Sequence, residues 1–263
     1  MTTAAMMAAG LAAGLHGALY GAYKDSPHES FLPRRFAREI VIALGVTAGL
    51  ALSWVGSAAY QESAFVIYLS VFALTRTATE FWKLFVRVEP QSEYRIPTQI
   101  HWCSTVIHNR FVRLALGIGF LASIYGIYEL GKTIPVSWPA PLRGMLVGLS
   151  IGVAEALAGG YKDGSVEGFS WRKFAKSPVF GTLGGLIASG HTMHPAFLLL
   201  AAIGSMRMFL ELLFKMLVRD YAPGKFRSMT GPFTEWMVRR QYFVVPYAVT
   251  WLLYVALCSH PDW

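Results

Sequence analysis

Two arginine–glutamate pairs with the same spacing stand in otherwise apolar stretches of the sequence. Arg76 precedes Glu80, and Arg207 precedes Glu211, each by four positions. In an α-helix this spacing places both side chains on one face, where opposite charges attract. A charge inside an apolar helix is costly unless it is paired or faces a wet cavity. Each pair therefore predicts either a neutralised link between packed helices or part of a pathway for a charged substrate or ion.

A second charged pattern also occurs twice. The residues Tyr23, Lys24, Asp25 and Glu29 recur as Tyr161, Lys162, Asp163 and Glu167. A cluster of Lys and Arg follows each copy. The carboxylates could hold a divalent cation and the basic residues a phosphate or a lipid head group. The same residues suit a short interfacial helix that touches anionic lipid. We favour this second interpretation, with the two copies acting as matched cytoplasmic gates or head-group contacts.

The sequence offers little for metal or enzyme chemistry. His191 and His194 are three positions apart and could share a metal, but two ligands are fewer than a zinc site uses. The sequence contains no P-loop, HExxH, GxSxG or zinc-type cysteine pairing, and no GxGxxG after a strand. We therefore expect no cofactor and no catalytic residues of those classes.

Composition favours the lipid bilayer as the solvent of this chain. Of its 263 residues 54% are hydrophobic and only 14% are charged, whereas soluble domains carry about 25% charged residues. A net charge of +8 would be compatible with nucleic acid, but the distribution of the basic residues favours a membrane. The apolar runs fall at 3–22, 39–60, 64–86, 111–130, 141–160, 178–193, 195–218 and 242–259. These predict an all-α integral membrane protein with eight spans, of which 178–193 is short enough to be re-entrant instead.

The basic residues give this topology an orientation. With eight spans, 19 of the 23 Lys and Arg fall on one side, in the segments 24–38, 83–113, 162–177 and 215–240. The other side keeps Lys132 and Arg143. The positive-inside rule then predicts that both termini lie on the non-cytoplasmic face of a plasma, inner or organellar inner membrane. Anionic head groups are the expected partners of the basic face, and nucleic acid is not expected.

An internal duplication organises the spans. The loop after the first run recurs after the fifth at an offset of 138, and Arg76 and Glu80 meet Arg207 and Glu211 at an offset of 131. Each half holds an even number of spans, so the halves enter the membrane in the same orientation. We expect one compact membrane domain made of two four-helix repeats, 1–130 and 131–263.

Glycine spacing and one further acid add detail to this arrangement. Glycines four apart in the first and fifth runs predict close helix packing, which makes these two runs central. Glu155 in the fifth run is a buried acid and a candidate proton carrier, although Gly17 takes its place in the first half. His16 is a conceivable partner for Glu155 across the axis between the halves. We group Glu155 with the two arginine–glutamate pairs as a substrate or ion path.

Three classes of function fit these features. The first is a transporter or channel for a small, anionic solute, because the arginines are the deepest fixed charges. The second is a non-catalytic subunit that scaffolds a larger membrane complex, as a homo-oligomer or with other chains. The third is a membrane enzyme that acts on lipid phosphate or head groups at the duplicated loops. We rank transport first and expect that the chain is not an enzyme.

The predicted topology can be tested by labelling. In a background with Cys103 and Cys258 replaced by serine, Arg35→Cys and Lys173→Cys should react with an impermeant maleimide from the same side, because the halves are parallel. Lys132→Cys serves as the control and should react from the other side. Labelling of the first two positions from opposite sides would rule out the parallel duplication.

Overall fold

The computed structural model describes residues 1–25, 31–53, 56–92, 94, 96–102, 105–210 and 243–260, with side chains except those of 24, 25 and 165–167. These residues are mostly helical. The elements are α1 (Thr3–Asp25), α2 (Pro33–Leu52), α3 (Gly56–Ala59), α4 (Ala64–Phe81), η1 (Trp82–Val86), β1 (His101–Trp102), β2 (Thr105–Val106), α5 (Arg110–Lys132), α6 (Ala140–Glu167), α7 (Trp171–Ser189), α8 (Pro195–Phe209) and α10 (Val244–Ser259). The strands form one antiparallel hairpin in which His101 faces Val106.

Local sequence explains where several of these helices begin. Ser63 caps α4 by accepting the backbone N–H of Val66, and Asn109 caps α5 by accepting those of Phe111 and Val112. Helices α2 and α8 begin with Pro33 and Pro195, whose fixed φ suits a first helical position. The chain leaves α6 at Gly168, whose φ of 78° lies in the left-handed region that favours glycine.

Each predicted apolar run coincides with a helix, yet the helices are not equally suited to a membrane. Four segments are long and apolar enough to cross one, namely Thr3–Tyr23, Ala64–Val86, Arg110–Lys132 and Ala140–Gly164. Helices α8 and α10 are apolar but shorter within the described residues. Helices α2 and α7 begin earlier than the runs 39–60 and 178–193, because their first turns carry the Lys and Arg of the duplicated loop. The chain is thus a mostly helical protein suited to a membrane, and crossing by all eight helices stays a prediction.

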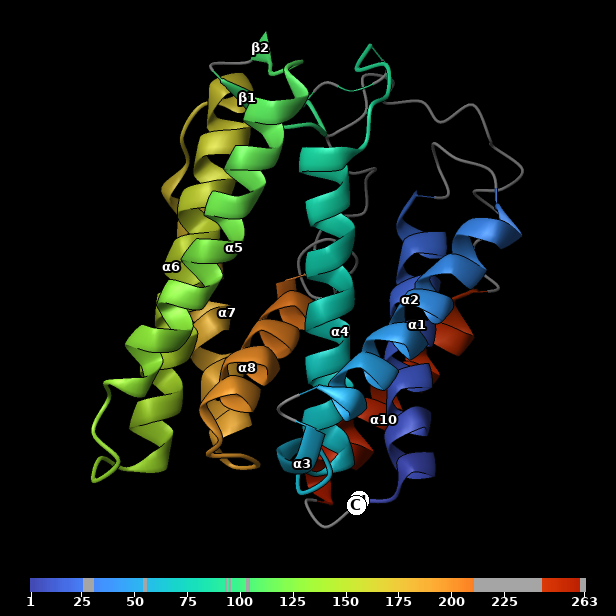
Figure 1. The fold of residues 1–263 in the computed structure, drawn as a ribbon, viewed down its shortest axis with the longest axis vertical. Helices are drawn as coiled ribbons and strands as arrows, with labels where there is room; N and C mark the ends of the chain where they lie inside the picture. Colours follow the sequence, from blue (N-terminus) through green and yellow to red (C-terminus); the bar gives the residue numbers. More distant parts are fainter. Residues whose placement is uncertain are drawn as a thin grey trace.

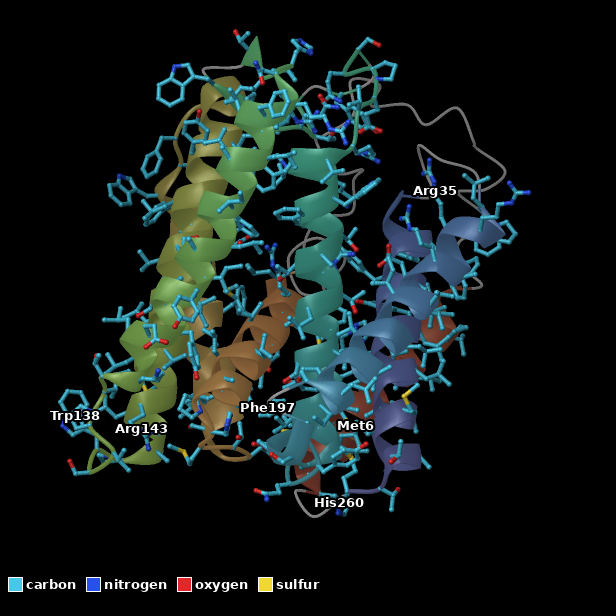
Figure 2. The ribbon with its side chains drawn as sticks, in the orientation of Figure 1. Met6, Arg35, Trp138, Arg143, Phe197 and His260 are labelled. Atoms are coloured by element: carbon cyan, nitrogen blue, oxygen red, sulfur yellow. The ribbon has the colours of Figure 1, made fainter. Side chains whose placement is uncertain are left out.

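The helices form a bundle in which α4, α5 and α6 run along the long axis and α2 and α8 cross it obliquely (Figure 1). Helices α5 and α6 lie on one side, α1, α2 and α10 on the other, and α4 and α8 between them (Figure 1). The hairpin of β1 and β2 lies at one end and α3 at the other. Arg35 lies toward the hairpin end, whereas Arg143 and His260 lie at the opposite end (Figure 2). In the described part of the chain, the hairpin between α4 and α5 lies at one end, whereas the connections of α5 to α6 and of α7 to α8 lie at the opposite end (Figure 1).

Helix α4 forms the centre of the core. Its consecutive residues from Phe65 to Ala73 are all buried, which no amphipathic surface helix would show. It packs against α1, α2, α8 and α10. Gly204 of α8 approaches α4 so closely that a Cβ atom there would lie 2.3 Å from the carbonyl oxygen of Leu69. The core thus joins residues from both ends of the sequence.

Small residues bring α6 and α7 into backbone contact. A Cβ atom at Gly148 would lie 2.0 Å from the carbonyl oxygen of Gly181, and one at Gly144 would lie 2.2 Å from that of Gly185. Helices α1 and α2 pack in the same way but less tightly, since Gly10 faces the Thr47 side chain. Such grooves let helices associate in lipid by close van der Waals packing, because burying apolar side chains there gives no hydrophobic gain.

Helix α5 packs partly on helices of residues 131–263, and α10 packs on helices of residues 1–130. Helix α5 contacts η1, α6 and α8, whereas α10 contacts α1 and α4. Because α6 and α8 belong to residues 131–263, and α1 and α4 to residues 1–130, each half contributes one helix to its neighbour. This exchange ties the two halves of the chain into one bundle.

Packing of α6 on α7 predicts a strong size dependence at one glycine. Gly148→Ala should lower the free energy of unfolding by about 1–3 kcal/mol or more, because the added methyl group meets backbone rather than a flexible side chain. Gly159→Ala on the same helix, where no atom lies within 4 Å of the added Cβ, is the matched control and should be neutral or slightly stabilising. Thermal unfolding in detergent micelles measures both. Equal melting temperatures for the two variants would contradict the close α6–α7 contact.

Candidate functional site

A bidentate ion pair joins α8 to α6. Its Arg207 and Glu155 side chains are 25% and 29% exposed, so the expectation that Glu155 is a buried acid is wrong. The Arg207 guanidinium contacts the Glu155 carboxylate through both of its terminal nitrogens, at 2.8 Å to Oε1 and 2.9 Å to Oε2. Two parallel hydrogen bonds of this kind fix geometry as well as charge. The idea that His16 is the partner of Glu155 is therefore wrong. The expected partner of Arg207 on its own helix, Glu211, lies outside the described residues.

Glu80 of α4 brings the first half of the chain to the same place. Its carboxylate accepts a hydrogen bond from Lys83 at 3.2 Å. Arg76 of α4, Lys162 of α6 and Arg207 of α8 also lie within electrostatic range of it. We call these residues the charge cluster: Arg76, Glu80, Lys83, Glu155, Lys162 and Arg207. The structure thus joins α4, η1, α6 and α8 around these charges, of which the sequence had paired only Arg76 with Glu80.

Arg76 takes a different partner from its counterpart Arg207. Its side chain is only 8% exposed, and the guanidinium carbon lies 5.7 Å from the centre of the Tyr20 ring of α1. A cation over an aromatic face is stabilised by the ring's negative potential. Tyr20 lies one helical turn beyond Gly17, the position equivalent to Glu155. Both arginines therefore face the first helix of their own half, one toward a ring and one toward a carboxylate.

His16 belongs to an aromatic cage that sequence reasoning missed. Its Nδ1 atom lies 2.6 Å from the Tyr68 hydroxyl, and both residues are at most 1% exposed. The rings of Phe72, Tyr247 and Trp251 surround it with centroid distances of 5.3–5.4 Å. The cage fills the contact of α1, α4 and α10. No signal in the sequence joins these positions, because they come from three distant segments.

One copy of the duplicated loop residues holds the hairpin of β1 and β2. The Tyr161 hydroxyl donates to the His101 carbonyl at 2.9 Å, and the two rings stack at 6.2 Å. The His101 Nε2 atom lies 3.2 Å from the Lys162 carbonyl. Because the hairpin connects α4 to α5, this contact links the second half to the first. We call it the Tyr161 contact.

The other loop positions are described only in part. Tyr23 lies near the end of α1 and Asp163 lies on α6, and both are half-buried. The side chains of Lys24, Asp25 and Glu167, and the whole of Glu29, lie outside what the structure describes. A match between the two copies of the loop therefore stays a prediction.

The two histidines of the 190–194 turn point to different neighbours. His191 packs on Phe65 at 4.6 Å, with its Nε2 atom 3.8 Å from the Cys258 sulfur, and His194 packs near Phe197. Across the described part of the chain, no group of three His, Cys, Asp or Glu residues is placed to hold a metal. Thr192 lies between the two histidines in the sequence, and its hydroxyl donates to the Glu62 carboxylate at 2.8 Å. Burial raises the pKa of the Glu62 carboxyl, which favours its neutral form at this end of the bundle.

No protein-family model, curated protein or solved structure matches this chain. Among the residues that the structure describes, the charge cluster has four cations and two carboxylates, and they come from both halves of the chain. Such a group can hold an anion or let an anion exchange with a carboxylate.

The Tyr161 contact predicts local protection of the hairpin. Tyr161→Phe removes a hydrogen bond worth about 0.5–1.5 kcal/mol, so amide exchange in residues 100–107 should quicken by up to about tenfold. Tyr125→Phe alters an exposed ring of α5 and is the matched control. Hydrogen–deuterium exchange with mass spectrometry measures both. Unchanged protection in Tyr161→Phe would mean that the hydroxyl does not hold the hairpin.

Proposed function

We propose that this chain is an eight-span membrane transporter or channel for a small anionic solute, with the path between two parallel four-helix halves. The observation that carries the proposal is the charge cluster. Glu80 comes from the first half, whereas Glu155, Lys162 and Arg207 come from the second. Charges from two repeats that meet inside an apolar bundle are typical of a transport site at a repeat interface.

Helix positions support the parallel duplication. Helices α2 and α7 begin at positions 33 and 171, an offset of 138, and α4 and α8 begin at 64 and 195, an offset of 131. The same offsets relate the repeated residues of the sequence. The exchange of α5 and α10 between the halves is what an axis along the bundle would generate.

Two matching close approaches between neighbouring helices support the parallel duplication in atomic detail. A Cβ atom at Gly14 would meet Ile40 Cα at 3.0 Å and the Glu39 carbonyl oxygen at 3.5 Å. A Cβ atom at Gly152 would meet Pro178 Cα at 2.6 Å and the Ser177 carbonyl oxygen at 2.4 Å. Every residue in the second set is 138 positions beyond its counterpart in the first. We infer that the first two helices of each half pack by a common inherited contact.

The excess of cations favours an anionic substrate. Arg207 offers a planar fork that binds carboxylate or phosphate oxygens in pairs, and Glu155 occupies this fork in the described state. A substrate anion would compete with Glu155 for Arg207. Glu155 would then act as an internal substitute that keeps the arginine paired when the path is empty. Lys83 and Lys162 would draw the anion toward the path from the basic face.

The orientation follows the charge distribution. The basic face would be cytoplasmic and in contact with anionic head groups, with both termini on the opposite side. The Tyr161 contact lies at that face, where it would act as a gate between the halves. Rocking of one half against the other would have to break or move it.

Anion flux tests the proposal. Purified protein in liposomes should carry at least one of chloride, phosphate or formate, and Arg207→Gln should reduce that flux by about tenfold or more, which corresponds to about 1.4 kcal/mol. Glu155→Gln should instead raise the affinity for the anion, because the fork of Arg207 loses its competitor. Arg172→Gln removes an exposed cation of α7 and is the matched control.

In a transport site, Arg207→Gln should weaken anion flux and Glu155→Gln should raise anion affinity. In a purely structural ion pair, both variants should lower the stability of the protein by a similar amount. No flux of any of the three anions in the wild type, or flux unchanged by Arg207→Gln in a folded protein, would end the proposal.

A subunit role in a larger membrane assembly is the second candidate. Helix α5 leaves most of its apolar surface uncovered, with Phe111 84% and Ile118 68% exposed. Lipid covers such a face in a monomer, and a second copy or another chain covers it in a complex. Purification as a monomer that still carries anions would favour transport by the isolated chain.

A further inference from the structure

Hydrogen bonds join the two halves of the chain at both ends of the bundle. The Tyr161 contact lies at the hairpin end. At the opposite end, Glu62 lies in the turn between α3 and α4, and Thr192 lies in the turn between α7 and α8. The Thr192 hydroxyl donates to the Glu62 carboxylate at 2.8 Å. We call this link the Glu62 contact, and its carboxylate can take up a proton.

The Glu62 contact lies at the starts of two helices that carry the charge cluster. Glu62 lies two residues before α4, which carries Arg76 and Glu80. Thr192 lies three residues before α8, which carries Arg207. Helices α4 and α8 also pack directly on each other. Glu62 is 18 positions from Glu80, or about 27 Å along a helix, so a proton on Glu62 would act on the cluster through the positions of these helices.

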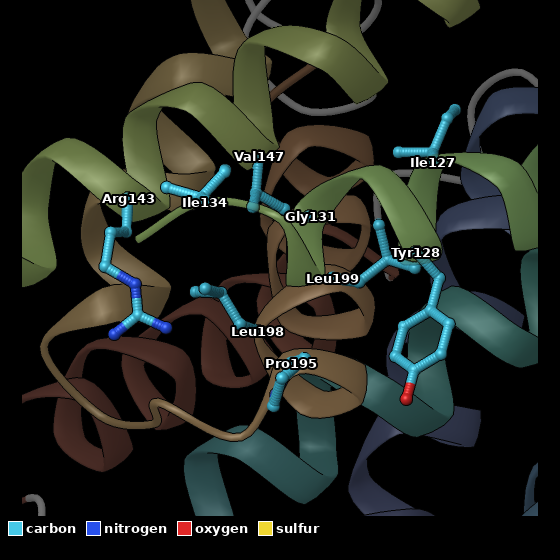
Figure 3. A pocket seen from close by; sticks show the side chains of 9 residues that line it. All are labelled: Ile127, Tyr128, Gly131, Ile134, Arg143, Val147, Pro195, Leu198 and Leu199. Carbon is cyan, nitrogen blue, oxygen red and sulfur yellow. The ribbon is translucent and has the colours of Figure 1, made fainter. Parts of the chain in front are cut away.

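The start of α8 is held in place by α5 and α6. Pro195, Leu198 and Leu199 lie close to Ile127 of α5 and Val147 of α6 (Figure 3). The side chains of Leu198, Leu199 and Val147 are only 3–6% exposed, so these helices meet through core packing. Opening the Glu62 contact therefore requires the start of α4 to move away from α8 together with the helices that hold it.

Burial decides how the Glu62 contact responds to protons. Thr192 is buried and Glu62 is half-buried, and removing a carboxylate from water disfavours its charged form. Burial therefore raises the pKa of the Glu62 carboxyl, whereas the hydrogen bond from Thr192 lowers this pKa by a smaller amount. An open contact would return the carboxyl to water and to its ordinary pKa. The closed contact therefore binds a proton more tightly than the open one.

Other titratable and charged groups lie at the same end of the bundle. His191 and His194 flank Thr192 in the sequence, and the His194 backbone N–H donates to the Thr192 hydroxyl at 3.1 Å. Because burial and Thr192 are the causes of the shifted pKa of Glu62, we expect the histidines to be its main competitors for a proton. The remaining described groups are the Met1 amine, Tyr60, Glu129 with Lys132, Arg143, Cys258 and His260.

We propose that Glu62 is a proton-binding site, and that the proton it takes from the water at this end of the bundle holds the Glu62 contact closed. The neutral carboxylic acid still accepts from Thr192 through its carbonyl oxygen and no longer carries a half-buried charge. A carboxyl whose pKa is raised in the closed contact stabilises that contact below its ordinary pKa. This stabilisation is lost as the pH rises through the raised value.

For transport, the consequence is a proton that closes one end of the path and so couples to the anion. This consequence rests on the proposed function, whereas proton-dependent closing of the Glu62 contact does not.

Distances between spin labels test the closing without a transport assay. In full-length protein with Cys103 and Cys258 replaced by serine, Gln61→Cys and Met193→Cys place labels at exposed positions on the two sides of the contact. From about pH 4 to about pH 8, which spans the titration of a carboxyl, the population with the short distance should fall several-fold. Glu62→Gln should keep the short distance throughout, because glutamine accepts from Thr192 but does not ionise. Glu129→Gln removes a more exposed acid at the same end and, as the matched control, should keep the pH dependence.

The outcomes separate the proton site from the transport proposal. A distance distribution that does not change with pH would overturn the proton site. A change that persists in Glu62→Gln would also overturn it and would assign the proton to a histidine. In liposomes, flux that depends on pH in the wild type should lose this dependence in Glu62→Gln. Flux that ignores pH in the wild type would overturn the coupling and leave the transport proposal standing. No flux would end the transport proposal, and pH-dependent closing would still establish the proton site.

Discussion

A charge within an apolar bundle must find its opposite, and this constraint decides which helices of the chain lie together. The desolvation of an arginine in hydrocarbon is offset only by a well-oriented partner. Arg207 meets that need by reaching Glu155 on α6, and Glu80 meets it among cations from α4, α6 and α8. The two halves of the chain therefore share one set of charges, carried by α4, α6 and α8.

Close backbone packing makes those charge contacts possible. The glycines of α6 allow α7 to approach within backbone contact, and Gly204 does the same for α8 against α4. Helix α6 also packs directly on α8, which brings Glu155 and Arg207 together. The first half has larger residues at the equivalent contacts, Thr47 and Ala43 in place of Gly185 and Gly181. It also replaces the carboxylate partner by the Tyr20 ring. Residues 1–130 and 131–263 thus differ in the side chains at these contacts and in the partner of the arginine.

Sequence reasoning succeeded where the signal is local. Apolar runs located the helices, and the offsets of 138 and 131 fall on the helix starts of α2 and α7 and of α4 and α8. It failed where partners are remote. The structure pairs Arg207 with Glu155 of α6, which a spacing rule along one helix cannot see. Glu211 lies outside the described residues, so its expected pair with Arg207 stays a prediction. The cage around His16 and the Tyr161 contact are tertiary in the same sense. Hydropathy also placed the starts of α2 and α7 too late, because their charged first turns are polar in sequence but helical in structure.

The Arg207–Glu155 pair is the contact on which this account depends, and a charge exchange tests it most directly. Arg207→Glu and Glu155→Arg should each destabilise the protein, since each leaves two like charges facing one another. The double variant should recover much of the loss, with a coupling free energy of about 1–3 kcal/mol in a double-mutant cycle of thermal or denaturant unfolding. Strictly additive losses would contradict the account, because they would mean that α6 and α8 do not meet through these charges.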